Sequence, residues 1–160
     1  MRSLILSLIL ALICFNAFGH ETFYKICNKR SGLVLTAADD DQGSAVVQAI
    51  SKARNKLQYW IQEDRAQGKR FRLANTQLCL DIENVKGPNM IIWKCHNDAN
   101  QLWNLQLSNG QFYRIQSKSD KNLYLDIQEN KDLKAGGRAV VRAKRTKNPE
   151  SQLWTFLEEF

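Results

Sequence analysis

The chain of 160 residues carries 23 lysines and arginines against 16 aspartates and glutamates, a formal net charge of +7, and 44% of its residues are hydrophobic. This length suits one compact domain of ordinary size. The positive charge is too sparse to favour nucleic-acid binding, and no segment after the first 20 residues is apolar enough to predict a transmembrane span.

The first residues have the pattern of a secretory signal peptide. Arg2 precedes an apolar run from Leu4 to Cys14, and Ala17-Phe18-Gly19 places small residues at the two cleavage-site positions. The apolar run is shorter than a membrane span needs, which favours a cleaved signal over a signal anchor. We therefore expect residues 1–19 to be removed and residues 20–160 to form a soluble, secreted protein.

The rest of the chain contains three copies of one sequence unit. Internal repeats of this kind are the first feature to consider in predicting a fold. The copies open on aromatic runs at Phe23, Phe71 and Phe112, and we expect repeats of about 23–70, 71–111 and 112–160. Three further features recur in each copy: leucine pairs (Leu33 and Leu35, Leu78 and Leu80, Leu123 and Leu125), apolar steps ("SAVVQ", "NMIIW", "RAVVR") and Gln-x-Trp triplets (Gln58 and Trp60, Gln101 and Trp103, Gln152 and Trp154).

The segments of each copy are short, alternating or β-branched, which predicts strands rather than helices. They are bounded by turn residues such as Ser31-Gly32, Gly87-Pro88 and Gly136-Gly137. About four strands per copy give roughly twelve in all, and an all-β chain usually protects its edges by closing into a barrel. Threefold repetition of four strands predicts a β-trefoil. The helix-like stretch Ser51–Trp60 stands where the other copies have a loop, so we expect a loop with at most one helical turn.

The three tryptophans of the triplets, Trp60, Trp103 and Trp154, are expected to lie in the core, because each can bury a large aromatic surface. The glutamine two residues before each tryptophan is expected to hydrogen-bond the backbone of the adjoining turn, since a buried amide needs partners. The triplet is therefore interpreted as scaffold.

Three cysteines remain after the expected cleavage: Cys27, Cys79 and Cys95. An oxidising compartment favours one disulfide and one thiol left over. Cys79 and Cys95 are the best pair because they bracket one loop of the middle copy.

With its three Gln-x-Trp triplets, the chain resembles ricin B-type lectin domains from about Phe23 to Phe156. The middle copy, "LCLDIENVKGPNMIIWKCHNDANQLW", is similar to the sugar-binding repeat of that family almost position by position. The resemblance implies a β-trefoil that binds galactose, N-acetylgalactosamine or other sugars through shallow pockets, without a cofactor or metal. It places the pocket aspartate at Asp81, the stacking aromatic at Trp93 and the pocket asparagine at Asn100, followed by Gln101. It also implies a disulfide between Cys79 and Cys95.

The chemistry of these side chains suits a sugar. A carboxylate accepts strong hydrogen bonds from two hydroxyls, a carboxamide both donates and accepts, and an indole face covers a patch of C–H groups. We expect Asp81 to be an exposed pocket carboxylate that contributes little to stability. Ile91 departs from the pattern, because galactose-binding members often carry a polar residue there. In the alternative interpretation Asp81 ends a strand, Trp93 is core and Asn100 caps a turn.

The other two copies lack a complete set of pocket residues. The first has Thr36, Gln48 and Leu57 at the aspartate, aromatic and asparagine positions. The third keeps Asp126 but has Arg142 and Ser151 at the other two. We expect a sugar pocket in the middle copy alone.

Two other classes of function compete with a lectin. Basic residues in "RAVVRAKRTK" (138–147) and "SKARNK" (51–56) could bind sulfated glycosaminoglycans or anionic membrane surfaces. An enzyme is disfavoured, because only His20 and His96 are available as histidines and no nucleophile elbow, metal-ligand spacing or glycine-rich phosphate loop is present. A role in defence or venom with a degenerate sugar site also remains open.

Overall fold

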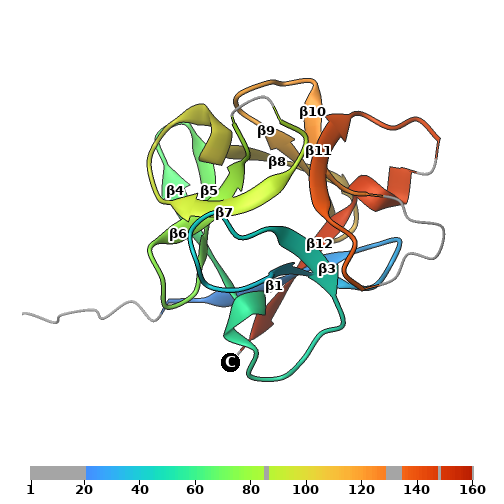
Figure 1. Cartoon of the computed structure of the whole chain (residues 1–160). Coiled ribbons are helices and arrows are strands. Elements are labelled where there is room, and N and C mark those ends of the chain that lie inside the picture. Colours follow the sequence, from blue (N-terminus) through green and yellow to red (C-terminus); the bar gives the residue numbers. More distant parts are fainter. Residues whose placement is uncertain (1–20, 85–86, 129–134, 148, 160) are drawn as a thin grey trace, which may run out of the picture.

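The computed structural model describes residues 21–84, 87–128, 135–147 and 149–159 (Figure 1). The expected signal peptide, residues 1–19, lies outside the described residues. The described chain contains twelve β-strands and three short 3-10 helices, in agreement with the predicted all-β class. No helix in these ranges combines the length and apolar character that crossing a membrane requires.

Six strands form a closed barrel. Each pairs antiparallel with the next, and the last, β12, pairs with the first from Phe23↔Glu159 to Asn28↔Trp154. Closure leaves none of these strands as a free sheet edge. In order around the ring they are β1 (Phe23–Asn28), β4 (Trp60–Arg65), β5 (Gly68–Leu73), β8 (Trp103–Asn109), β9 (Phe112–Ser117) and β12 (Trp154–Glu159).

The other six strands form three hairpins, one from each repeat. Isolated β-bridges join the hairpins in a cycle: Ala45↔Ile91, Asn89↔Val140 and Val47↔Arg138. In Figure 1 the inner strands β3, β7 and β11 surround the centre of the view, so the hairpins form a three-part cap on the barrel. They are β2 (Val34–Ala37) with β3 (Val46–Ala49), β6 (Leu78–Ile82) with β7 (Met90–Lys94), and β10 (Leu123–Ile127) with β11 (Ala139–Ala143).

The core lies between barrel and cap. Trp60, Trp103 and Trp154 are fully buried at the starts of β4, β8 and β12. The indole Nε1 of Trp60 donates to Leu35 O (3.0 Å), and that of Trp154 donates to Leu125 O (3.1 Å). The Trp103 Nε1 has no hydrogen-bond partner in the structure as described.

The glutamines of the triplets hold the chain ahead of each tryptophan, as predicted. Each lies at the end of a short 3-10 helix: η1 (Lys56–Gln58), η2 (Ala99–Gln101) or η3 (Pro149–Gln152). Their Nε2 groups donate to backbone carbonyls of Ile50, Lys94 and Ala143 at 2.8–3.0 Å. Their Oε1 atoms accept from the backbone N–H groups of Lys52, His96 and Arg145 at 2.8–2.9 Å. The stretch Ser51–Trp60 contains one short 3-10 helix, also as expected.

The predicted disulfide is confirmed. Cys79 on β6 is bonded to Cys95, the residue after β7, across 16 positions of the sequence. Cys27 on β1 is a free thiol of intermediate exposure, and its burial raises the pKa of the thiol.

Candidate functional site

A pocket of about 150 Å³ opens on the middle repeat. It lies on the β6–β7 hairpin, where Cys79 pairs with Trp93 and Asp81 pairs with Ile91, and η2 closes one side of it. The residues that line it include Asp81, Asn84, Ile91, Trp93, His96 and Asn100. The structure therefore brings Asp81, Trp93 and Asn100 to one place.

Asp81 forms the floor of the pocket. Its Oδ1 accepts a 2.7 Å hydrogen bond from Asn100 Nδ2, and its Oδ2 accepts a 2.6 Å hydrogen bond from Gln101 Nε2. The residue is only 3% exposed, so the expectation of an exposed carboxylate is wrong. The sequence motif does not reveal that two amides cover the carboxylate. Burial raises the pKa of Asp81, although the hydrogen bonds from Gln101 and Asn100 oppose that rise.

Trp93 forms the exposed side of the pocket. Its side chain is 41% exposed, whereas the tryptophans of the three triplets are fully buried. The alternative that Trp93 is a core residue is therefore excluded. A loop of the first repeat lies against it: Gly43 N–H donates to Ile92 O (2.8 Å), and a β-carbon at Gly43 would lie 3.7 Å from Trp93 Cζ3. This contact limits one edge of the indole and leaves a face open.

The short helix η2 supplies the amides. Asn100 is 8% exposed and lines the pocket, so its free amide positions remain within reach of a ligand. Gln101 is fully buried and does not line the pocket. The structure thus places the fourth expected binding residue behind Asp81, where it orients the carboxylate.

His96 is a pocket residue that the sequence analysis did not assign to the site. Its Nε2 lies 3.4 Å from Asp81 Oδ2, and its side chain is 33% exposed. The repeat register contains a signal for it, because His96 and Arg145 each precede a Gln-x-Trp triplet and donate their backbone N–H to its glutamine. A side chain at this position reaches the pocket aspartate of its own repeat.

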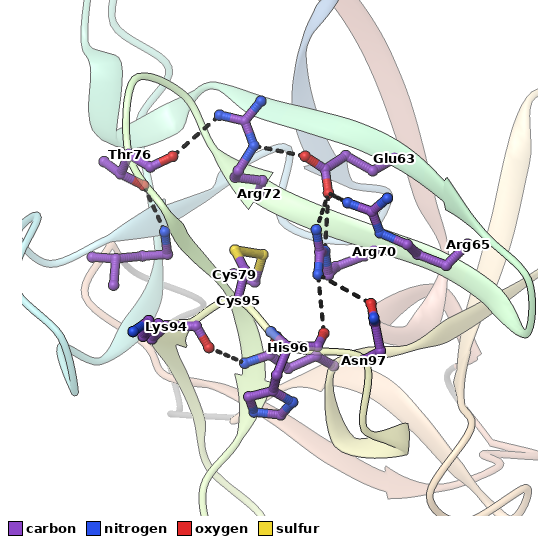
Figure 2. Close-up of polar contacts among 12 residues, drawn as sticks. Glu63, Arg65, Arg70, Arg72, Thr76, Cys79, Lys94, Cys95, His96 and Asn97 are labelled. Atoms are coloured by element: carbon purple, nitrogen blue, oxygen red, sulfur yellow. Dashed lines mark hydrogen bonds and ion pairs between the residues drawn. A yellow bond between two sulfur atoms is a disulfide. The ribbon is translucent and has the colours of Figure 1, made fainter.

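The backbone that carries His96 is held by a charged network on β4 and β5, the Glu63 network (Glu63, Arg65, Arg70 and Arg72). Figure 2 shows Glu63 between the three guanidinium groups, with Arg70 extending to His96 and Asn97. Arg70 donates to His96 O at 3.0 Å and to Asn97 Oδ1 at 3.4 Å. Burial raises the pKa of Glu63, but hydrogen bonds from Arg72 and Arg70 outweigh it, and the pKa falls below its usual value. Glu63 therefore remains ionised and keeps Arg70 directed at the loop.

The disulfide anchors the same loop from the other side. Cys95 follows β7 directly and is bonded to Cys79, and its backbone N–H donates to Gln77 O (2.9 Å). Figure 2 shows this disulfide and His96, the residue that follows Cys95. Together, the disulfide and Arg70 fix the wall of the pocket before any ligand arrives, which lowers the entropic cost of binding.

The corresponding position of the third repeat is filled by a side chain. Asp126 is fully buried, and its Oδ2 accepts hydrogen bonds from Arg145 Nε (2.7 Å) and Gln152 Nε2 (3.3 Å). Its Oδ1 accepts from the backbone N–H of Ile127 (2.8 Å). Arg145 thus occupies the space that a sugar hydroxyl would need.

The first repeat lacks both the carboxylate and the exposed aromatic side chain of the middle repeat. Thr36 Oγ1 accepts from Gln58 Nε2 (3.3 Å), and Gln48, at the aromatic position, is fully buried.

No group of three or more metal-binding side chains occurs among the described residues.

A six-stranded barrel capped by three hairpins, with a pocket on one hairpin, defines a β-trefoil binding domain. The model of the ricin-type beta-trefoil lectin domain matches residues 22–154, so the chain belongs to that family. No curated protein matches the chain.

Solved structures share the fold at low sequence identity. A designed three-fold symmetric protein, ThreeFoil, is 23% identical with a TM-score of 0.75, over 84% of this chain and 97% of its own. A ricin B-like lectin of Macrolepiota procera, in complex with lactose, is 20% identical with a TM-score of 0.69, over 84% and 93%. The C-half of an earthworm R-type lectin, in complex with GalNAc, is 20% identical with a TM-score of 0.65, over 87% and 99%. The same fold also forms one part of larger proteins, since the match to a mosquitocidal holotoxin covers only 17% of that protein's chain.

Proposed function

We propose that the protein is a secreted, non-catalytic lectin that binds one galactose- or N-acetylgalactosamine-type residue in the pocket of the middle repeat. The observation that carries the proposal is the meeting of a carboxylate, an exposed indole and a carboxamide in one small pocket. Lectins of this fold hold lactose and GalNAc in complexes, which supports this class of sugar. The disulfide between Cys79 and Cys95 supports secretion, because such bonds persist in oxidising compartments.

Each pocket residue has a role in this proposal. Asp81 has used one acceptor position on each oxygen for an amide, and each carboxylate oxygen accepts at least one more hydrogen bond. Two adjacent sugar hydroxyls can therefore donate to it. Trp93 covers the apolar face of the ring, and Asn100, which already holds Asp81, keeps its side-chain oxygen as an acceptor for a further hydroxyl.

In this proposal the polar side chains of the pocket set its selectivity. Ile91 is 8% exposed and lines the pocket beside Trp93, and it has no polar group for a hydroxyl. His96 supplies a polar group on the other side of Asp81. We infer that the discriminating hydroxyls of the ligand are read by Asp81, Asn100 and His96.

A single shallow pocket implies weak binding. Monosaccharide affinity is expected to be about millimolar, or about −4 kcal/mol. Useful avidity then requires clustered ligands or association of several lectin molecules.

The test is a glycan array followed by titration with lactose and with N-acetylgalactosamine. Wild-type protein is expected to bind glycans that end in galactose or N-acetylgalactosamine. Trp93→Ala is expected to lose at least tenfold in affinity while unfolding at the same temperature, because an indole that is 41% exposed adds little to the core. Leu107→Ala is the matched control, since Leu107 is 63% exposed and lies away from the pocket. Equal binding by wild type and Trp93→Ala would refute the proposed site.

A further inference from the structure

The third repeat carries an arginine at the position of the stacking tryptophan. In the β6–β7 hairpin Cys79 pairs with Trp93, and in the β10–β11 hairpin Tyr124 pairs with Arg142 at the same register. Asp126 and Val140 correspond in the same way to Asp81 and Ile91. The side chains that would face a sugar in the third repeat are therefore known from the strand pairing.

The acidic floor of this position is neutralised within the protein. Arg145 Nε donates to Asp126 Oδ2 at 2.7 Å, and the two side chains are 19% and 0% exposed. A carboxylate so covered cannot accept hydrogen bonds from hydroxyls of a neutral sugar. The electrostatic potential at this surface then depends on the basic side chains of the same repeat.

Four basic side chains lie on the β10–β11 hairpin and in the segment after it, and we call them the third-repeat cations (Arg138, Arg142, Lys144 and Lys147). Arg142 is partly exposed and the other three are exposed. None of the four has an ion pair or a side-chain hydrogen bond in the described part of the chain. Among the described residues of the adjoining elements, the carboxylates are Asp120, in the turn before β10, and Glu150 in η3.

We propose that this surface is a second binding site, which takes the sulfate or carboxylate groups of an acidic saccharide. A guanidinium presents paired N–H donors that fit the oxygens of a sulfate or carboxylate, and such charge-assisted hydrogen bonds are stronger than neutral ones. Arg142 stands where the middle repeat has its sugar platform, so an acidic ring would meet the guanidinium in place of an indole. The two hairpins are neighbours, joined by Val141 N–H to Pro88 O at 2.7 Å, so both sites belong to one cap.

The same cations suit an anionic membrane less well. Among the described residues, the large hydrophobic side chains that are exposed are Ile50, Trp93, Leu107 and Leu157. None of them belongs to the described part of the β10–β11 hairpin or of the segment after it, so the described part of this surface offers no large apolar side chain to insert among lipids. The charge without apolar anchors favours a saccharide in solution.

The test uses a heparin-derived octasaccharide, its fully desulfated form, and vesicles that contain phosphatidylserine. The double variant Arg142→Gln with Lys144→Gln is expected to lose about tenfold or more in affinity for the octasaccharide. The matched control, Lys52→Gln with Arg54→Gln, removes the same charge from exposed positions of the first repeat and is expected to change affinity by less than about twofold. The desulfated form keeps only its carboxylates and is expected to bind more weakly than the sulfated octasaccharide.

This inference rests on the proposed lectin function only in taking the ligand to be a saccharide. Different experimental outcomes would refute the two proposals. Trp93→Ala is expected to keep octasaccharide binding, and the Arg142 and Lys144 variant is expected to keep lactose binding. If the wild-type protein binds the octasaccharide but not lactose, only the proposed site in the middle repeat is refuted. Equal losses in the double variant and its control, or vesicle binding without octasaccharide binding, would overturn the third-repeat site.

Discussion

Gln101 donates a 2.6 Å hydrogen bond from Nε2 to Oδ2 of Asp81, although it belongs to the triplet that builds the scaffold. The same Nε2 donates to Lys94 O (3.0 Å), and the Oε1 accepts from His96 N–H (2.9 Å). One glutamine therefore ties together the pocket carboxylate, the end of β7 and the loop that carries His96. The same side chain therefore joins the scaffold to the proposed binding site.

Removal of the Asp81 carboxylate is expected to affect stability as well as binding. Asp81→Ala leaves the amides of Asn100 and Gln101 without their acceptor, and unsatisfied buried donors cost about 1–3 kcal/mol of unfolding free energy. Lactose binding should disappear in the same variant. Urea denaturation and lactose titration measure the two effects. Asp64→Ala is the control, because that carboxylate is 83% exposed on β4 and does not line the pocket, so both quantities should stay near wild-type values.

Lactose affinity is expected to depend on pH through Asp81. Burial raises the pKa of this carboxyl above its ordinary value, and the hydrogen bonds from Gln101 and Asn100 reduce that rise. In the proposed site the ionised carboxylate accepts the sugar hydroxyls, so affinity should be full above this pKa and fall as the pH drops through it. The fall should begin at a higher pH than an ordinary aspartate, about 3.9, would produce.

Calorimetric titrations between neutral and acidic pH, with circular dichroism at each pH to show that the fold persists, measure this dependence. Constant affinity down to about pH 4 would contradict the role given to the carboxylate.

The three core tryptophans are expected to differ in their tolerance of phenylalanine. Any of them changed to alanine should lose about 3–5 kcal/mol of unfolding free energy, because a large cavity opens. Trp103→Phe should be less costly than Trp154→Phe by about 1 kcal/mol, since of these two tryptophans Trp154 alone donates its indole N–H, to Leu125 O. Chemical denaturation of both variants measures the difference. Equal losses would show that Trp103 finds a partner in solution.

The disulfide is expected to stabilise the fold and the pocket together. Cys79 and Cys95 close a loop across 16 positions, for which chain-entropy arguments give about 3 kcal/mol. The variant Cys79→Ala with Cys95→Ala should lose about that much stability and bind lactose more weakly, because His96 follows Cys95. Urea denaturation and lactose titration measure both losses, and Cys27→Ala, which removes only the free thiol, should change neither. Peptide mapping without reduction should recover the Cys79–Cys95 bridge and an alkylatable Cys27.

The repeat pattern predicted the fold because the trefoil is built from local features that recur. Gln58, Gln101 and Gln152 make equivalent backbone hydrogen bonds in three places, so their spacing in the sequence corresponds directly to their positions in space. The same register identified the copy that combines Asp81, Trp93 and Asn100. The burial of Asp81 was not predictable from the motif, because it depends on how the amides of η2 fold over β6.

The sequence by itself determined the number of repeats and favoured the pairing of Cys79 with Cys95, because both rest on residue types at recurring separations along the chain. The assignment of the expected pocket residues to the middle repeat came from the resemblance to ricin B-type lectin domains. Only the tertiary structure decided that His96 faces Asp81 whereas Arg145 bonds directly to Asp126. Both side chains arise at the same point of the repeat, but one is an imidazole 3.4 Å away and the other a guanidinium at 2.7 Å. The physical reason is reach and charge: arginine extends to the buried carboxylate and neutralises it, whereas the shorter histidine leaves the pocket above Asp81 open.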